Sequence, residues 1–245
     1  MLSRDRLTLL GLSLLCLLNI PLGLQVGAVA VSVEEVVNTL FDLPGPQQAY
    51  IILQARLPRV LLALLTGAAL ALSGTIIQTL LRNPLASPKI IGINSGAAAA
   101  VLLCMVWLPD LTMQWLPLAA CMGGMIAGGL ILLLAERHTL LPSRLILLGL
   151  AVGFVAEAVV DFLLVTLPIY SISAPLVWLT GSLWARNWQH VASAAPILLT
   201  LSTSVLWLFY RLDLAMLSDQ QGQGLGINVT WEKRLLLLLA TVLAA

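Results

Sequence analysis

Long runs of apolar residues, separated by short polar stretches, set the pattern of this chain. A helix that crosses the hydrocarbon core of a bilayer needs about 20 predominantly apolar residues. Six runs approach or exceed that length, at residues 7–31, 57–81, 96–108, 116–135, 145–167 and 191–210, and a seventh begins at 235 and continues to 245. Residues 90–95 would extend the short third run. The pattern predicts an all-α fold, a polytopic transmembrane helix bundle with six full spans and the start of a seventh.

The first apolar run follows Arg4 and Arg6, and a basic start is also typical of a secretory signal peptide. The apolar region of a signal peptide has only about 7–15 residues and ends at a cleavage site with small side chains. Because this run is longer and further spans follow it, we predict an uncleaved transmembrane helix.

Composition supports a membrane protein. Hydrophobic residues make up 60% of the chain and charged residues only 9%, whereas a soluble domain carries about 25% charged residues. A net charge of +1 and the lack of a basic run argue against nucleic acid as a partner. Cys16, Cys104 and Cys121 all lie in apolar runs without metal-ligand spacing, so we interpret them as packing residues.

The charges of the short loops predict the orientation. Of the 12 Lys and Arg residues, only Arg56, Arg59 and Arg186 fall on the outer side if the N-terminus is cytoplasmic. Cytoplasmic loops carry an excess of Lys and Arg. We therefore predict a cytoplasmic N-terminus.

Small residues recur at spacings that suit close helix packing. In a membrane, helices associate through small residues that let their backbones approach, as in G-x-x-x-G pairs. The candidates are Gly124 with Gly128, Gly149 with Gly153, and the face formed by Gly67, Ala71 and Gly74. Together they predict one compact bundle.

No motif for catalysis is present: the sequence has no G-x-x-x-x-G-K-[ST] loop, no H-E-x-x-H and no nucleophile elbow. We therefore predict no catalytic residue, no metal site and no cofactor. The polar residues inside the spans are the remaining candidates. Glu157 and Asp161 share one helix face, and an intramembrane acid is a functional candidate by default. They either line a transport pathway or reach interfacial water near the outer end of the helix.

Ser73, Thr75 and Gln78 lie inside the second run. Their polar groups either line a pathway or form hydrogen bonds between helices. The sequence leaves both interpretations open.

Four short sequence motifs follow one another along the chain, and their order is more informative about function than the apolar runs are. Arg56-Leu57-Pro58-Arg59 precedes the second run, where Pro58 suits the first turn of a helix. Arg82-Asn83-Pro84-Leu85-Ala86-Ser87-Pro88 follows that run, and Asn83-Pro84 is expected to end the helix. The others are Trp178-Leu179-Thr180-Gly181-Ser182-Leu183-Trp184 and Leu214-Ala215-Met216-Leu217-Ser218-Asp219. This order resembles the FecCD family of importer permeases over nearly the whole chain.

The resemblance implies a permease subunit of an ATP-driven importer in the bacterial inner membrane, which translocates an iron–siderophore, with ferric dicitrate as one candidate. Its expected partners are cytoplasmic ATPase subunits, a periplasmic binding protein, a second permease subunit that is identical or homologous, and membrane lipid. Arg56 and Arg59 are the expected docking residues for the binding protein. The expected coupling loop to the ATPase includes Asp213, Leu214, Leu217, Asp219, Leu225 and Gly226.

The family fold has roughly ten spans of about 20 residues each, so residues 1–245 are expected to form a single permease domain that is incomplete at its C-terminus. Glu157 has no recognised counterpart in the family, and Ser218 and Gly222 stand where the family has glycine and alanine. Two alternatives remain: a proton-coupled secondary transporter that uses Glu157 and Asp161, and a truncated product that does not transport.

Overall fold

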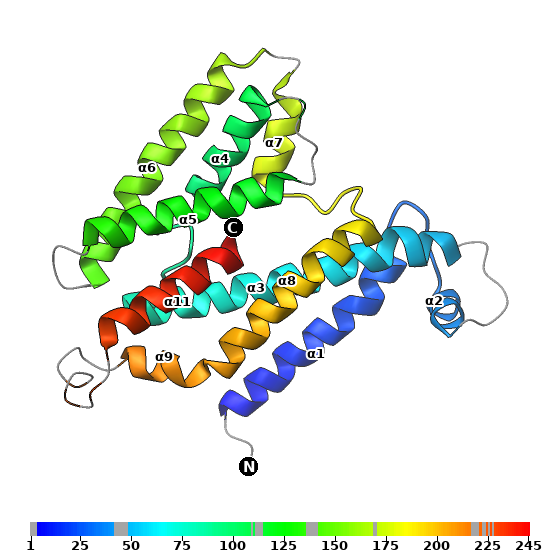
Figure 1. Ribbon diagram of the computed structural model, residues 1–245. Coiled ribbons are helices and arrows are strands. Elements are labelled where there is room, and N and C mark those ends of the chain that lie inside the picture. The colour runs from blue at the N-terminus through cyan, green and yellow to red at the C-terminus, as the bar shows by residue number, and fades with distance from the viewer. Residues whose placement is uncertain are drawn as a thin grey trace. The chain divides into compact units, whose positions relative to one another are not determined.

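The computed structural model describes residues 4–41, 49–108, 110, 115–135, 142–168, 171–216, 221, 224, 226 and 228–245. The ordered elements among these residues are helices. The chain divides into two compact units, one formed by residues 1–66 with 183–197 and the other by residues 67–182 with 198–245. The division falls inside two helices, α3 (Leu57–Leu81) and α8 (Trp188–Trp207). Figure 1 labels the α-helices of both units.

The first unit contains α1 (Arg4–Gln25), α2 (Val33–Leu40) and a π-helix, η1 (Ile51–Arg56), which leads into α3. A capping box starts α2: the Glu35 N–H donates to Ser32 Oγ at 3.2 Å, and the Ser32 N–H donates to Glu35 Oε2 at 2.7 Å. Leu24, Val31, Val36 and Ile52 form the buried core of this unit. The indole N–H of Trp188 donates to the Leu53 carbonyl at 2.8 Å and ties the start of α8 to η1.

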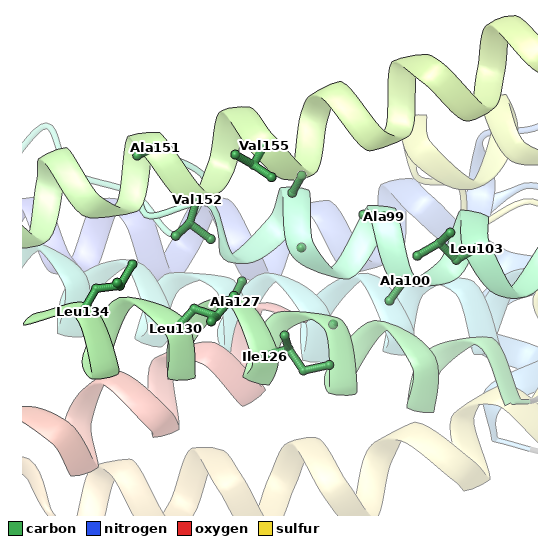
Figure 2. Close-up of a pocket in the computed structure, with 13 residues that line it drawn as sticks. Ala99, Ala100, Leu103, Ile126, Ala127, Leu130, Leu134, Ala151, Val152 and Val155 are labelled. Atoms are coloured by element: carbon green, nitrogen blue, oxygen red, sulfur yellow. The ribbon is translucent and has the colours of Figure 1, made fainter.

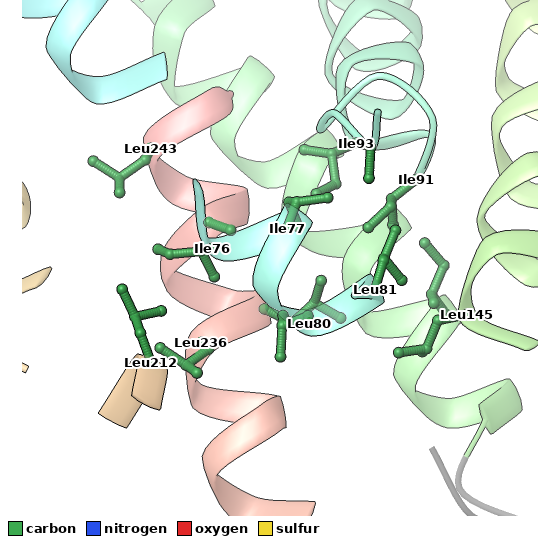
Figure 3. Packing of buried hydrophobic residues seen from close by; sticks show 14 of the residues in the cluster. Ile76, Ile77, Leu80, Leu81, Ile91, Ile93, Leu145, Leu212, Leu236 and Leu243 are labelled. Atoms are coloured by element: carbon green, nitrogen blue, oxygen red, sulfur yellow. The ribbon is translucent and has the colours of Figure 1, made fainter. Parts of the chain in front are cut away.

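The second unit contains α4 (Ile93–Trp107), α5 (Leu116–Ala135), α6 (Pro142–Thr166), α7 (Ser173–Thr180), α9 (Phe209–Met216) and α11 (Val229–Ala244), with the ends of α3 and α8. Its largest apolar core is built from residues of α3, α4, α5, α6, α8, α9 and α11, and Figure 3 shows part of it. The labelled members are Ile76, Ile77, Leu80, Leu81, Ile91, Ile93, Leu145, Leu212, Leu236 and Leu243.

Five helical stretches of the described residues are long and apolar enough to cross a membrane: Asp5–Gln25, Ile51–Leu81, Leu116–Ala135, Pro142–Thr166 and Trp188–Trp207. The predicted fold class, an all-α transmembrane bundle, is confirmed. The third predicted run forms α4, an apolar helix of 15 residues that is shorter than these five stretches.

An irregular segment precedes α4. Residues 82–92 run without a regular helix, yet Ala86 and Ile91 are only 3% and 1% exposed. Local backbone bonds, such as Ala86 N–H to the Asn83 carbonyl at 3.1 Å, satisfy part of this segment. The segment is only partly buried, because Leu85 is 83% exposed and Arg82, Pro84 and Lys89 are also exposed.

Candidate functional site

The start of α4 is pressed against the backbone of α6. Gly92 has a φ of +72°, and a β-carbon there would lie 2.7 Å from Gly153 Cα and 2.8 Å from the Gly149 carbonyl oxygen. A β-carbon on Gly149 would in turn meet Ile91 Cα at 2.8 Å. The turn that begins α4 therefore packs against α6 at Gly149 and Gly153, where the absence of side chains leaves room for it.

One helical turn beyond that contact, α4 and α6 share a polar pair. The Ser95 hydroxyl donates to Glu157 Oε1 at 3.1 Å, and Ser95 is only 7% exposed. Glu157 and Asp161 are both exposed on α6. Sequence reasoning did not single out Ser95 as a site residue, since its partner lies 62 positions away and no local signal connects the two.

Glu157 lies well inside its helix. It is 15 residues after Pro142, or about 22 Å along an axis that rises 1.5 Å per residue. The helix has 25 residues, and Asp161 is closer to its end at Thr166. An ionised carboxylate is expensive at membrane depth unless it faces water or a polar partner. Ser95 is one such partner, and the exposed side of Glu157 needs another.

The polar residues of α3 separate into two groups. Ser73 is fully buried, and its hydroxyl donates to the Ala240 carbonyl of α11 at 2.6 Å, which is a hydrogen bond between helices. Thr75 and Gln78 are exposed, and the Thr75 hydroxyl donates to the Ala71 carbonyl of its own helix at 2.9 Å. Ser73 is therefore part of the packing, whereas Thr75 and Gln78 face away from the unit.

The small residues predicted to pack helices together differ in whether another helix lies against them. On α5, Gly124 and Gly128 face α11, where β-carbons would meet Ala245 Cβ at 2.8 Å and Thr241 Oγ1 at 2.9 Å. On α3, a β-carbon on Gly67 or Gly74 would have open space, and Ala71 is exposed. This face of α3 contacts no described helix closely.

A cavity of about 460 Å³ opens between α4, α5 and α6 (Figure 2). Its lining consists only of glycine, alanine, valine, leucine and isoleucine. A site that binds a polar ligand needs a few placed polar groups, and this lining has none. The cavity is therefore a poor candidate for a hydrophilic substrate.

The two arginines before α3 differ in their surroundings. Arg56 is 8% exposed, and its guanidinium donates to the carbonyls of Leu24 and Gln25, both at 2.7 Å, and to the carbonyl of Val29. Arg59 is half-buried. Among the described residues it has no hydrogen-bond or ion-pair partner, and its Nε is a buried atom without an acceptor.

The predicted coupling segment is only partly described. Leu212 is buried in the core, Asp213 is exposed and Leu214 is half-buried on α9. Gly226 is exposed with a φ of +73°. Leu217, Asp219 and Leu225 lie outside the described residues.

Comparison with known proteins assigns this arrangement to a family. Residues 13–245 match the model of the FecCD transport family. The chain belongs to that family.

Relatives of this FecCD chain include the Fe(3+)-citrate import system permease protein YfmE of Bacillus subtilis, which is 39% identical over 99% of this chain and 72% of its own length. The achromobactin transport system permease protein CbrC of Dickeya dadantii is 38% identical over 96% of this chain and 68% of its own length. A solved structure, described as an inward-facing conformation of a metal-chelate type ABC transporter, matches with a TM-score of 0.83 and 30% identity over 97% of this chain and 73% of that one.

This FecCD chain is thus a permease subunit of an ATP-binding-cassette transporter and is not itself an enzyme. It is a multi-pass inner-membrane protein, and permeases of this kind work with an ATPase and a substrate-binding protein. The family decides against proton-coupled secondary transport through Glu157 and Asp161. The absence of a cofactor stays a prediction.

Proposed function

We propose that this permease carries a ferric chelate across the inner membrane, with ferric citrate or a siderophore complex as its cargo. The observation that carries the proposal is the match to iron-chelate permeases along nearly the whole chain. This chain is 39% identical to YfmE, which is named for Fe(3+)-citrate import, and 38% identical to CbrC, which is named for achromobactin transport. Because these two identities are nearly equal, they support the class of substrate and do not distinguish one chelate from another.

The proposed assembly has two permease subunits, identical or homologous, surrounded by lipid. A binding protein docks at the end of the first unit that carries Arg56 and Arg59, and ATPase subunits contact the α9 region. Glu157, Asp161, Thr75 and Gln78 are the proposed pathway-lining residues, since all are exposed polar groups on apolar helices. The buried hydroxyl of Ser73 is left out of this set because it bonds to α11.

Uptake of radioactive iron tests the proposed function. The permease would be expressed with its ATPase, binding protein and any second permease in a strain that lacks other ferric chelate importers. We expect accumulation of ⁵⁵Fe from ferric citrate or from a ferric siderophore, and its loss when the P-loop lysine of the ATPase is replaced. Uptake that persists with the inactive ATPase, or a failure to accumulate iron from any ferric chelate, would refute the proposal.

The proposed orientation makes a separate prediction. Positive charges favour the cytoplasmic side, so α2 should face the periplasm and the start of α11 the cytoplasm. In a background without the three native cysteines, Glu34→Cys should react with a membrane-impermeant maleimide in intact cells, and Thr230→Cys only after permeabilisation. Both positions are exposed. The reverse labelling pattern would place the N-terminus in the periplasm.

A further inference from the structure

The apolar cavity between α4, α5 and α6 is an open groove. The buried part of its lining is small and includes Gly96, Gly123 and Ala127. The exposed part carries larger side chains, among them Ile126 and Leu130 of α5 and Val155 of α6, which Figure 2 labels. Its volume of about 460 Å³ lies within the range of roughly 300–1,000 Å³ that is usual for ligand sites. The groove is therefore large enough to hold part of an apolar molecule.

The shape of the groove suits a flexible chain better than a helix. Membrane helices associate through small residues that let their backbones approach. The small residues here already face one another, since a β-carbon on Gly96 would lie 2.6 Å from Ala127 Cβ and 2.8 Å from the Gly123 carbonyl oxygen. The large side chains at the opening would hold a second helix away from the buried lining. A hydrocarbon chain can bend to fill the groove and restore the contacts that an empty space forfeits.

One basic residue lies on the side of α6 that borders the groove. Arg144 precedes the lining residues Ala151 and Val155 by 7 and 11 positions. At 3.6 residues per turn, these spacings return to within about 20° of the same direction, and Arg144 lies about 10 Å along the axis from Ala151. Cα–Cβ bonds tilt toward the start of a helix, so the arginine side chain extends from the groove toward the beginning of α6 at Pro142.

The charge of Arg144 is available to an outside anion. The side chain is exposed and has no hydrogen-bond or ion-pair partner among the described residues. It stands in the first turn of α6, where the helix dipole disfavours a cation, so the charge does not stabilise its own helix. A guanidinium binds phosphate oxygens through two parallel hydrogen bonds.

We propose that an anionic phospholipid occupies this groove, with one acyl chain against the apolar lining and its phosphate on Arg144. In the proposed orientation the start of α6 faces the cytoplasm, and the cytoplasmic leaflet carries the anionic lipids. Lipid tails are as apolar as the lining, so burial of the chain does not select among lipids. Selection comes from the charge of the headgroup, whichever chelate the permease carries.

Photolabelling of the assembled transporter in phosphatidylcholine nanodiscs tests this proposal. The probes are phosphatidylglycerol and phosphatidylcholine that carry the same diazirine in one acyl chain, and mass spectrometry locates the adducts. We expect adducts on Ile126, Leu130 or Val155. Phosphatidylglycerol should label about fivefold more than phosphatidylcholine, because the attraction of an anionic lipid surface is worth about that factor for each Lys or Arg near it. High salt should reduce the difference.

Matched variants separate the headgroup from the chain. Arg144→Gln should abolish the preference for phosphatidylglycerol and Arg144→Lys should keep it, as should Arg6→Gln, which removes another exposed arginine on the same predicted side. Ala151→Phe should reduce labelling by both lipids because it narrows the groove. Ala158→Phe adds the same bulk at an exposed position of α6 outside the lining and should leave labelling unchanged. Residues 144 and 151 are exposed, so we expect wild-type melting temperatures.

Three results would overturn the proposal. Equal labelling by the two lipids, or a preference that survives Arg144→Gln, would remove the role of the headgroup. Undiminished labelling of the lining in Ala151→Phe would place the chain outside the groove. A lack of lipid adducts, together with a crosslink between the two permease subunits through Leu130→Cys, would show that the partner subunit covers the groove instead.

Discussion

Replacement of Gly92 by alanine is expected to destabilise the permease strongly. A side chain at a φ of +72° costs roughly 1–3 kcal/mol. The added β-carbon would also lie 2.7 Å from Gly153 N and Cα, and overpacking of this kind costs about 1–3 kcal/mol or more. Backbone atoms cannot rotate away as a side chain can. Together these terms, about 2–6 kcal/mol, are a large share of a typical folding free energy of about 5–15 kcal/mol.

Yield and thermal stability of the detergent-solubilised protein would measure this effect. Gly67→Ala is a matched control, since a β-carbon there meets no atom within 4 Å and the position lies inside α3. We expect Gly67→Ala to behave like the wild type. If Gly92→Ala melted at the wild-type temperature, the close contact between α4 and α6 would be wrong.

The spans were the most predictable part of the fold. The predicted runs 57–81 and 116–135 coincide with α3 and α5, because the bilayer demands a continuous apolar stretch and polar residues end it abruptly. Helix α11 begins at Val229, six residues before the predicted 235. Its first turns contain Glu232, Lys233 and Arg234. Because these residues are charged, a search for apolar runs does not detect the start of this helix. Its actual start signal is the cap at Asn228, whose side chain accepts from the Trp231 N–H.

The short helices were not predicted for a related reason. With 8 residues each, α2 and α7 are too short to produce an apolar run. A capping box at Ser32 and Glu35 marks α2 in the sequence, and a search for that motif would have found it. Nothing comparable marks α7, which has no side-chain cap at its N-terminus.

The environment of the candidate residues depends on contacts between distant segments. Arg56 and Arg59 look equivalent in the sequence, and only carbonyls 27–32 positions away distinguish them. Ser73 and Thr75 are likewise similar in sequence, yet one hydroxyl bonds to α11 and the other to its own helix. Residue type thus identified polar candidates, whereas burial and hydrogen bonding decided which of them remain available to a substrate or a partner.

A double change on the exposed face of α9, Tyr210→Ala with Asp213→Lys, is expected to uncouple ATP hydrolysis from transport. Phe209, Tyr210 and Asp213 of α9 are all exposed, whereas Leu212 is 5% exposed and packs in the core. Exposed aromatic residues are typical anchors of protein interfaces. Under the proposed assembly they contact the ATPase, so we expect about a tenfold weaker ATPase interaction, a loss of about 1.4 kcal/mol, and a matching loss of iron uptake.

The control for this prediction is Leu212→Ala on the buried face of the same helix. Removal of a buried leucine side chain costs about 2–5 kcal/mol of stability, so this variant should yield less folded protein. The molecules that do fold should still stimulate ATP hydrolysis and transport iron in the wild-type ratio. The double variant should show the opposite, with normal yield and melting temperature but hydrolysis that no longer responds to the loaded binding protein. Normal coupling in the double variant would exclude this face of α9 from the ATPase contact, because a reversed charge and a lost aromatic ring cannot both be neutral at the centre of an interface.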